Sequence, residues 1–155
     1  MQFGRLRRRE FISLLSGAAA GWPLAAHAQQ PERMRRIGVL MNLAADDPQG
    51  QARLAGFQQT LQQLGWNDGR NVGIDIRWHE NDADRARRYA HELVALAPDI
   101  FLADASVSVA ALQHVTRTLP IVFANVADPV GAGFVDSLSR PSGNNYRLHD
   151  FRIRV

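Results

Sequence analysis

Residues 98–144, PDIFLADASVSVAALQHVTRTLPIVFANVADPVGAGFVDSLSRPSGN, carry the strongest fold signal in the chain. They contain two short apolar runs without interruption, at residues 100–103 and 121–124. Such runs are typical of strands buried on both faces of a parallel sheet, where the alternation of side chains disappears. Each run is followed by small and polar residues and then by a helical pattern. The stretch therefore predicts a strand, a loop and a helix, twice in succession.

The chain before this stretch predicts two more strands. Residues 36–41 form another apolar run, which indicates the first and central strand of the sheet. Residues 72–78 instead alternate apolar and polar side chains. Because alternation is typical of a strand with one solvated face, we expect this strand at an edge of the sheet.

Helices are expected between these strands. Asp47 is a natural N-cap and Pro48 suits the first helical position, so the first helix is expected to run from there to Gly65. The second helix is expected to start at residue 81 or 82 and the third near Val107. A further helix is expected after the fourth strand. With it the total is four helices, and without it three.

Strands that alternate with helices imply right-handed crossovers between parallel strands. We therefore predict an α/β fold with a doubly wound parallel sheet, whose strands, numbered along the chain, take the order 2-1-3-4. We expect this domain to span residues 36–144. The 127 residues that follow the first 28 are enough for one domain of ordinary size and too few for two.

Small and polar residues follow the predicted strands and mark a candidate site. Ligands of open α/β sheets bind outside the carboxyl ends of the strands, where helix N-termini offer unpaired backbone N–H groups. Three of the candidates have alternative roles. The hydroxyls of Ser106 and Ser108 could cap a helix, and Asp128 before Pro129 is typical of an Asx turn. The candidate ligand-binding residues are Asn42, Ala44, Asp104, Ala105, Ser106, Ser108, Asn125 and Asp128.

The run LPIVFANVADPVGAGFVDSLSRPSGN, residues 119–144, resembles the tryptophan/tyrosine-type family of ABC transporter substrate-binding proteins, which have a type I periplasmic-binding fold. The matching motifs are Asp-Pro-Val at residues 128–130, Gly-x-Val-x-Ser-Leu at residues 133–138 and Pro-Ser-Gly-Asn at residues 141–144. Ser142 replaces the first glycine of the family's Pro-Gly-Gly-Asn. The resemblance covers roughly residues 5–144 and implies that the predicted domain is one lobe of that fold.

The resemblance implies a binding protein rather than an enzyme, with no cofactor. Its ligand would be a small polar molecule such as an amino acid, held in a cleft between two lobes, and its partner an ABC permease in the inner membrane. Ser106 and nearby backbone N–H groups would then hold a ligand carboxylate, while Asn125 and Asp128 suit ligand amino or hydroxyl groups. Asp104-Ala105 departs from the family's usual Gly or Ser followed by Thr or Ser. Asp104 would repel a carboxylate or turn toward an ammonium group.

Composition excludes several other classes of function. The chain has no Cys. It also has no Lys, and once the first 28 residues are set aside its Arg side chains equal its acids in number. Because the net charge is then close to zero, no nucleic-acid partner is expected. The five His are scattered, without the spacing of metal ligands. There is also no Gly-x-Ser-x-Gly motif, so a serine nucleophile is not expected.

The first 28 residues read as an export signal. A basic start that contains Arg8 and Arg9 precedes an uncharged stretch from Phe11 to Ala26. The small residues Ala26 and Ala28 predict cleavage after Ala28. Arg8-Arg9 followed by Phe11 resembles a twin-arginine motif, with a Sec signal as the alternative. Either route predicts a periplasmic protein that meets the export machinery, with residues 29–35 as a linker.

Residues 145–155 lack the family's x-Thr-Gly and last strand, which suggests a frameshift or premature stop that leaves one lobe and impairs binding. The alternative is a genuine short strand at residues 151–155, where apolar side chains alternate with Arg. Two other functions stay open. The chain could be a small exported α/β interaction module, or a flavodoxin-like enzyme without an identifiable catalytic motif.

Overall fold

Five strands and three helices alternate along the residues that the computed structural model describes, 34–137 and 144–147. The strands and helices occur in the predicted sequence order, with one strand more than expected. Their bounds are β1 Arg35–Met41, α1 Pro48–Gln63, β2 Val72–Trp78, α2 Ala83–Ala95, β3 Ile100–Asp104, α3 Ala105–Val115, β4 Ile121–Ala124 and β5 Asn145–Arg147.

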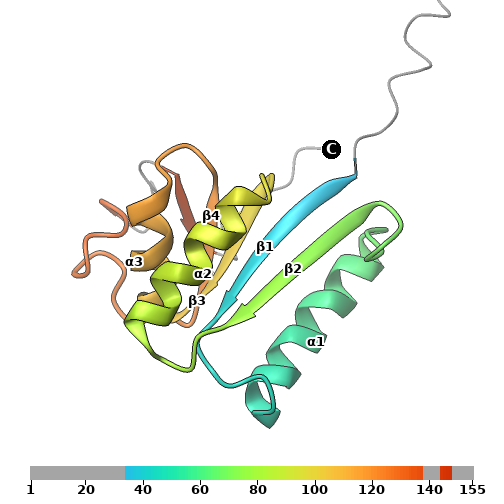
Figure 1. Cartoon of the computed structure of the whole chain (residues 1–155), viewed down its shortest axis with the longest axis horizontal. Helices are drawn as coiled ribbons and strands as arrows, with labels where there is room; N and C mark the ends of the chain where they lie inside the picture. Colours follow the sequence, from blue (N-terminus) through green and yellow to red (C-terminus); the bar gives the residue numbers. More distant parts are fainter. Residues whose placement is uncertain (1–33, 138–143, 148–155) are drawn as a thin grey trace, which may run out of the picture. The chain divides into compact units, whose positions relative to one another are not determined.

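The strands form one sheet in the order β2-β1-β3-β4-β5, and every neighbouring pair is parallel (Figure 1). This confirms the predicted α/β class and the order of the first four strands. The strand with alternating side chains, β2, lies at an edge as expected, with Val39 opposite Ile76 in the register with β1. The carboxyl ends of all five strands therefore meet at one edge of the sheet, which we call the carboxyl edge.

The helices cover the two faces of the sheet unequally. α2 and α3 pack on one face, over a buried cluster that includes Leu40, Leu93, Phe101 and Leu112. α1 packs on the other face near β1 and β2, where Phe57 contacts a smaller cluster. Gly50 is required at this contact, because a Cβ there would lie 2.8 Å from the Trp78 ring. No helix among the described residues is long and apolar enough to cross a membrane.

The helix starts follow from capping chemistry. The carboxylate of Asp47 accepts hydrogen bonds from the N–H groups of Gln49 and Gly50, at 2.8 and 3.1 Å. Asp82 caps α2 in the same way. α3 differs, because it begins at Ala105, two residues earlier than predicted, and has no side-chain cap.

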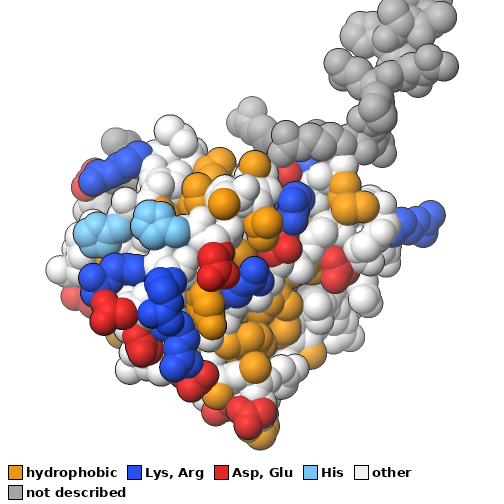
Figure 2. Space-filling view, viewed as in Figure 1, with side chains coloured by type: hydrophobic (Ala, Val, Ile, Leu, Met, Phe, Trp, Pro, Cys, Tyr) orange, Lys and Arg blue, Asp and Glu red, His pale blue; other side chains and the backbone are white. Residues whose placement is uncertain are grey.

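The exposed face of α2 is rich in both signs of charge. Figure 2 shows Arg side chains gathered over α2, with Asp and Glu among them. Arg85 pairs with Glu80, Arg87 with Asp84, and Arg77 of β2 reaches Glu92 at 3.0 Å. The arginines of this face are thus largely neutralised by neighbouring acids, as expected for a solvated surface.

Two expectations about the end of the chain were wrong. In the part of the segment between β4 and β5 that is described, turns replace the predicted helix, since the N–H of Phe134 bonds back to the carbonyl of Pro129 at 2.9 Å. Pro129 and Gly133, whose φ is +72°, favour turns over a helix. The strand β5 was not predicted either. The signal segment 1–28, most of the linker and the alternative strand at 151–155 lie outside the described residues.

Candidate functional site

Most of the predicted site residues lie together along the carboxyl edge. Asn42 directly follows β1, Asp104 ends β3, and Asn125 directly follows β4. The side-chain amide of Asn125 donates a hydrogen bond of 2.6 Å to Asp104 Oδ1. This bond joins the loops after β3 and β4, which lie side by side because the two strands are neighbours in the sheet.

Asp104 is the buried centre of this edge. Only 3% of the residue is exposed, and Arg53 Nη1 lies 3.1 Å from each of its carboxylate oxygens. A buried carboxylate needs such a partner, because its charge would otherwise be removed from water without compensation. Asp104 was predicted to repel a ligand carboxylate or to attract an ammonium group. Its charge is instead balanced within the chain by an arginine from α1.

Sequence reasoning missed Arg53, although a signal for it was present. Gly50, Leu54 and Leu61 form the buried stripe of α1. Arg53 lies three positions after Gly50 and four before Phe57, so it falls on the same inward stripe. An arginine on a buried stripe predicts an acidic partner inside the fold.

Left-handed backbone shapes the loops that follow β3 and β4. Ala105 has a φ of +69° and Asn125 a φ of +56°. Asn tolerates this region, whereas Ala does so at a cost of about 1–2 kcal/mol. The turn at Ala105 takes the chain from β3 directly into α3. The first N–H groups of α3 therefore start at the carboxyl edge without a side-chain cap.

Ser106 and Ser108 occupy different environments. Ser106 is exposed at the start of α3, where its hydroxyl can meet a ligand. Ser108 is fully buried, and its hydroxyl donates to the carbonyl oxygen of Asp104 at 2.6 Å. Ser108 thus holds the first turn of α3 against β3 from inside the protein.

His79 is a second functional candidate that sequence reasoning missed. It follows β2, is fully buried, and places Nε2 2.8 Å from Ser108 Oγ. Because the Ser108 proton is already donated to Asp104, Nε2 must carry the proton in the bond to Ser108. Nδ1 has no partner among the described residues. Burial lowers the pKa of His79 below its ordinary value, although Asp104 and Asp82 act in the opposite direction.

The remaining predicted residues lie at the rim. The carbonyl of Asn42 accepts from the N–H of Asn81 at 2.8 Å, while its side-chain oxygen is buried without a partner in the described part of the chain. Ala44 starts the turn that leads to α1, since its carbonyl accepts from the N–H of Asp47 at 3.2 Å. Asp128 accepts from the N–H of Gly131 at 2.8 Å. This bond stabilises the turn that contains Pro129.

The edge offers several hydrogen-bonding groups to a ligand. Its open groups are the α3 N-terminus, the Ser106 hydroxyl and the Asn42 side-chain oxygen. Among the described residues, no three acidic or histidine side chains gather in a way that could hold a metal ion. The arrangement can bind the polar end of a small molecule next to a helix N-terminus.

Comparison with known proteins places this arrangement in a family. The pattern of the ABC transporter substrate binding protein family matches residues 36–150. A tyrosine-binding protein from Clostridioides difficile (strain R20291) is 31% identical over 142 residues, which are 90% of this chain and 41% of that protein.

Solved structures give the same result. A conserved domain protein from Vibrio cholerae superposes with a TM-score of 0.69 and 29% identity, over 74% of this chain and 38% of that one. An ABC domain from Streptococcus pneumoniae in complex with L-Trp superposes with a TM-score of 0.68 and 30% identity, again over 74% and 38%. The chain spans less than half the length of these relatives. It belongs to the ABC transporter substrate-binding protein family.

Proposed function

We propose that the chain is the N-terminal lobe of a substrate-binding component of an ABC importer, and that its ligand is an amino acid of the aromatic class. The observation that carries this proposal is the family match over residues 36–150, which includes the whole sheet and the carboxyl edge. The ligands named for two relatives, tyrosine and L-Trp, support the choice of ligand class.

The geometry of the carboxyl edge supports an amino-acid ligand. The uncapped N-terminus of α3 and the Ser106 hydroxyl suit the carboxylate of an amino acid. The Asn42 side-chain oxygen is an unused acceptor that suits an ammonium group. Asp104 does not oppose the carboxylate strongly, because Arg53 neutralises its charge.

A single lobe supplies only part of a closed site. Small-molecule sites bury most of the ligand surface, and cleft-type proteins reach this by closing two lobes around it. Ser106 and Asn125 are exposed at the edge of the described lobe, so a ligand there would keep one side in water. We therefore propose that the described lobe supplies one side of the ligand site and performs no catalysis.

The proposal extends to location and partners. An ABC permease in the inner membrane would receive the ligand, and the protein would act in the periplasm after export through the predicted signal segment, with cleavage after Ala28. The sequence of residues 1–28 is the support for export.

Calorimetric titration of the chain with L-tryptophan, L-tyrosine and L-glutamate tests the proposal. We expect binding of the two aromatic amino acids and none of L-glutamate. Ser106→Ala should weaken binding by about three- to tenfold, because it removes one hydrogen bond to a carboxylate.

Thr118→Ala is the matched control, since Thr118 is an exposed hydroxyl residue beyond the opposite end of α3. It should leave the affinity unchanged. Equal affinity for all three amino acids, or equal losses in the two variants, would contradict the proposed ligand class and site.

A further inference from the structure

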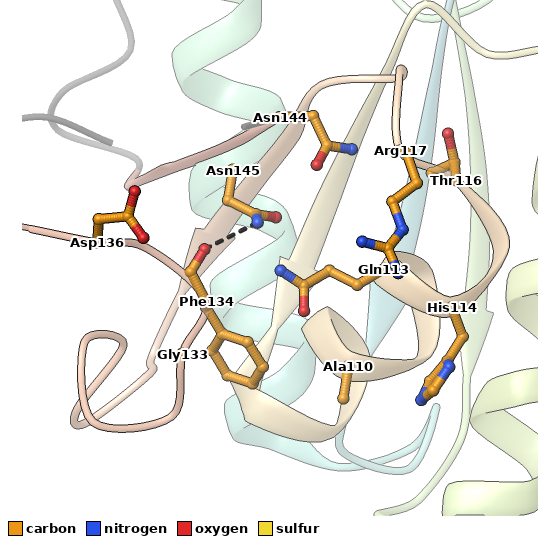
Figure 3. Close-up of a pocket in the computed structure, with 10 residues that line it drawn as sticks. All are labelled: Ala110, Gln113, His114, Thr116, Arg117, Gly133, Phe134, Asp136, Asn144 and Asn145. Carbon is orange, nitrogen blue, oxygen red and sulfur yellow. Dashed lines mark hydrogen bonds between the residues drawn. The ribbon is translucent and has the colours of Figure 1, made fainter. Parts of the chain in front are cut away.

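A hollow of about 380 Å³ lies at the other end of α3. It is formed by the last turns of α3 and the residues just after it, together with the loop after β4 and the start of β5 (Figure 3). Because α3 starts at the carboxyl edge of the sheet and β5 is parallel to β4, this hollow lies at the opposite, amino edge. It is therefore separate from the candidate ligand site.

The hollow contains a buried polar atom that lacks a partner. Asn145 is 4% exposed, and its amide nitrogen donates to the carbonyl of Phe134 at 2.9 Å. Its side-chain oxygen has no partner among the described residues. In Figure 3 this oxygen points away from Phe134, toward the hollow. A buried acceptor of this kind is costly unless a hydrogen-bond donor occupies the hollow.

The wall opposite Asn145 carries polar groups that are also unused. Gln113 on α3 and Arg117 just after it extend over the hollow (Figure 3). Neither side chain forms a hydrogen bond or ion pair with the part of the chain that is described, whereas most arginines near α2 are paired with acids. The Phe134 ring lies at the floor and adds an apolar surface. The hollow thus presents a cation, an acceptor and a ring within one small space.

We propose that this hollow is a second binding site, for a small carboxylic acid that also carries a hydroxyl or amide donor and an apolar group. The carboxylate would pair with the guanidinium of Arg117, which suits planar anions. The donor would satisfy the Asn145 oxygen, and the apolar group would pack on Phe134. The volume is within the range of small-molecule sites.

Two probes that differ by one hydroxyl test the role of Asn145. 3-Phenyllactate carries a carboxylate, a hydroxyl and a ring, and 3-phenylpropionate lacks only the hydroxyl. In ¹H–¹⁵N correlation spectra of the full chain, we expect 3-phenyllactate to shift the side-chain amides of Asn145 and Gln113. We expect 3-phenylpropionate to bind about two- to tenfold more weakly, which is the effect of one hydrogen bond.

A pair of surface variants tests the role of Arg117. Arg117→Gln should lower the affinity for 3-phenyllactate by about five- to tenfold, because it removes a charge-assisted pair that is partly screened by water. Arg88→Gln is the matched control, since Arg88 is an exposed arginine on α2. It should leave the affinity unchanged.

Several outcomes would overturn the proposal. Equal affinity for the two probes would show that the Asn145 oxygen receives no donor from the ligand. Equal effects of the two arginine variants would remove Arg117 from the site. Absence of shifts at Asn145 and Gln113 would show a hollow filled by water alone, and shifts confined to Ser106 and Asn125 would assign the probe to the candidate ligand site.

Discussion

The two ends of α3 differ in whether a buried polar group finds a partner within the protein. At its start, the buried carboxylate of Asp104 is fully partnered by Arg53 and Asn125. At its end, the buried oxygen of Asn145 has no partner within the described residues, and the exposed Arg117 nearby forms no ion pair with them. The Asp104 carboxylate is held by the protein itself, whereas the Asn145 oxygen is left open. A buried polar group that the fold satisfies stabilises the lobe, and one that it does not satisfy is, on our proposals, a candidate contact for a ligand.

The largest expected effect comes from breaking the partnered end. Arg53→Met leaves the Asp104 carboxylate buried without its cation, and we expect the free energy of unfolding to fall by about 2–3 kcal/mol. This estimate is below that for a fully buried pair, because the Arg53 side chain is 32% exposed. Urea unfolding monitored by circular dichroism measures it.

Arg117→Met is the matched control for that change. It removes an exposed arginine at the open end, so stability should change by less than about 0.5 kcal/mol. Losses of the same size in both variants would mean that the two ends of α3 do not differ as described.

A smaller loss of folding stability is expected when the pH is lowered. Burial lowers the pKa of His79 below its ordinary value of 6.5. The unfolded chain therefore binds a proton at His79 at a higher pH than the folded chain does, so stability is complete above about pH 6.5 and falls as the pH drops toward the folded pKa. Asp82, whose pKa is lowered by hydrogen bonds from the α2 backbone, adds a separate loss only below its ordinary value of 3.8.

His79→Gln isolates the histidine contribution. Gln keeps a donor for Ser108 but does not titrate, so the stability loss just below pH 6.5 should become shallower while the loss near pH 3.8 remains. Unfolding midpoints in urea, measured across this pH range, show the difference. A variant with an unchanged pH profile would assign the loss to other groups.

The smallest effect concerns the backbone at the start of α3. Ala105 has a φ of +69°, which glycine adopts without strain. Ala105→Gly should therefore raise stability by about 0.5–1 kcal/mol, after allowing for the greater freedom of glycine in the unfolded chain. Ala110→Gly, within the same helix, should lower stability by about 1 kcal/mol. Opposite signs in thermal unfolding support the strained turn, and a loss in both variants contradicts it.

The sequence predicted the parts of the fold that depend on local pattern. Three apolar runs and one alternating segment predicted four strands, and Asp47 and Asp82 placed two helix starts. β5 was missed because three residues, Asn145–Arg147, are too few to show a period. The helix expected after β4 was wrong because Pro129 and Gly133 favour turns there.

The candidate site was predicted in part for a related reason. Residues that directly follow strands could be placed at the carboxyl edge, because the parallel order brings those loops together. Arg53 and His79 were missed because their partners lie 51 and 29 residues away in sequence. Local pattern indicates that a side chain is buried, but only the packed fold shows which group it meets.

The most direct test of the account is a map of where L-tryptophan binds. ¹H–¹⁵N correlation spectra of the full chain, recorded with increasing L-tryptophan, report each backbone N–H separately. The account predicts that the largest shifts fall at the start of α3, at Ser106 and Val107, and at Asn42 and Asn125. Largest shifts at the end of α3, near Arg117 and Asn145, or no shifts at all, would contradict the claim that the carboxyl edge is the amino-acid site.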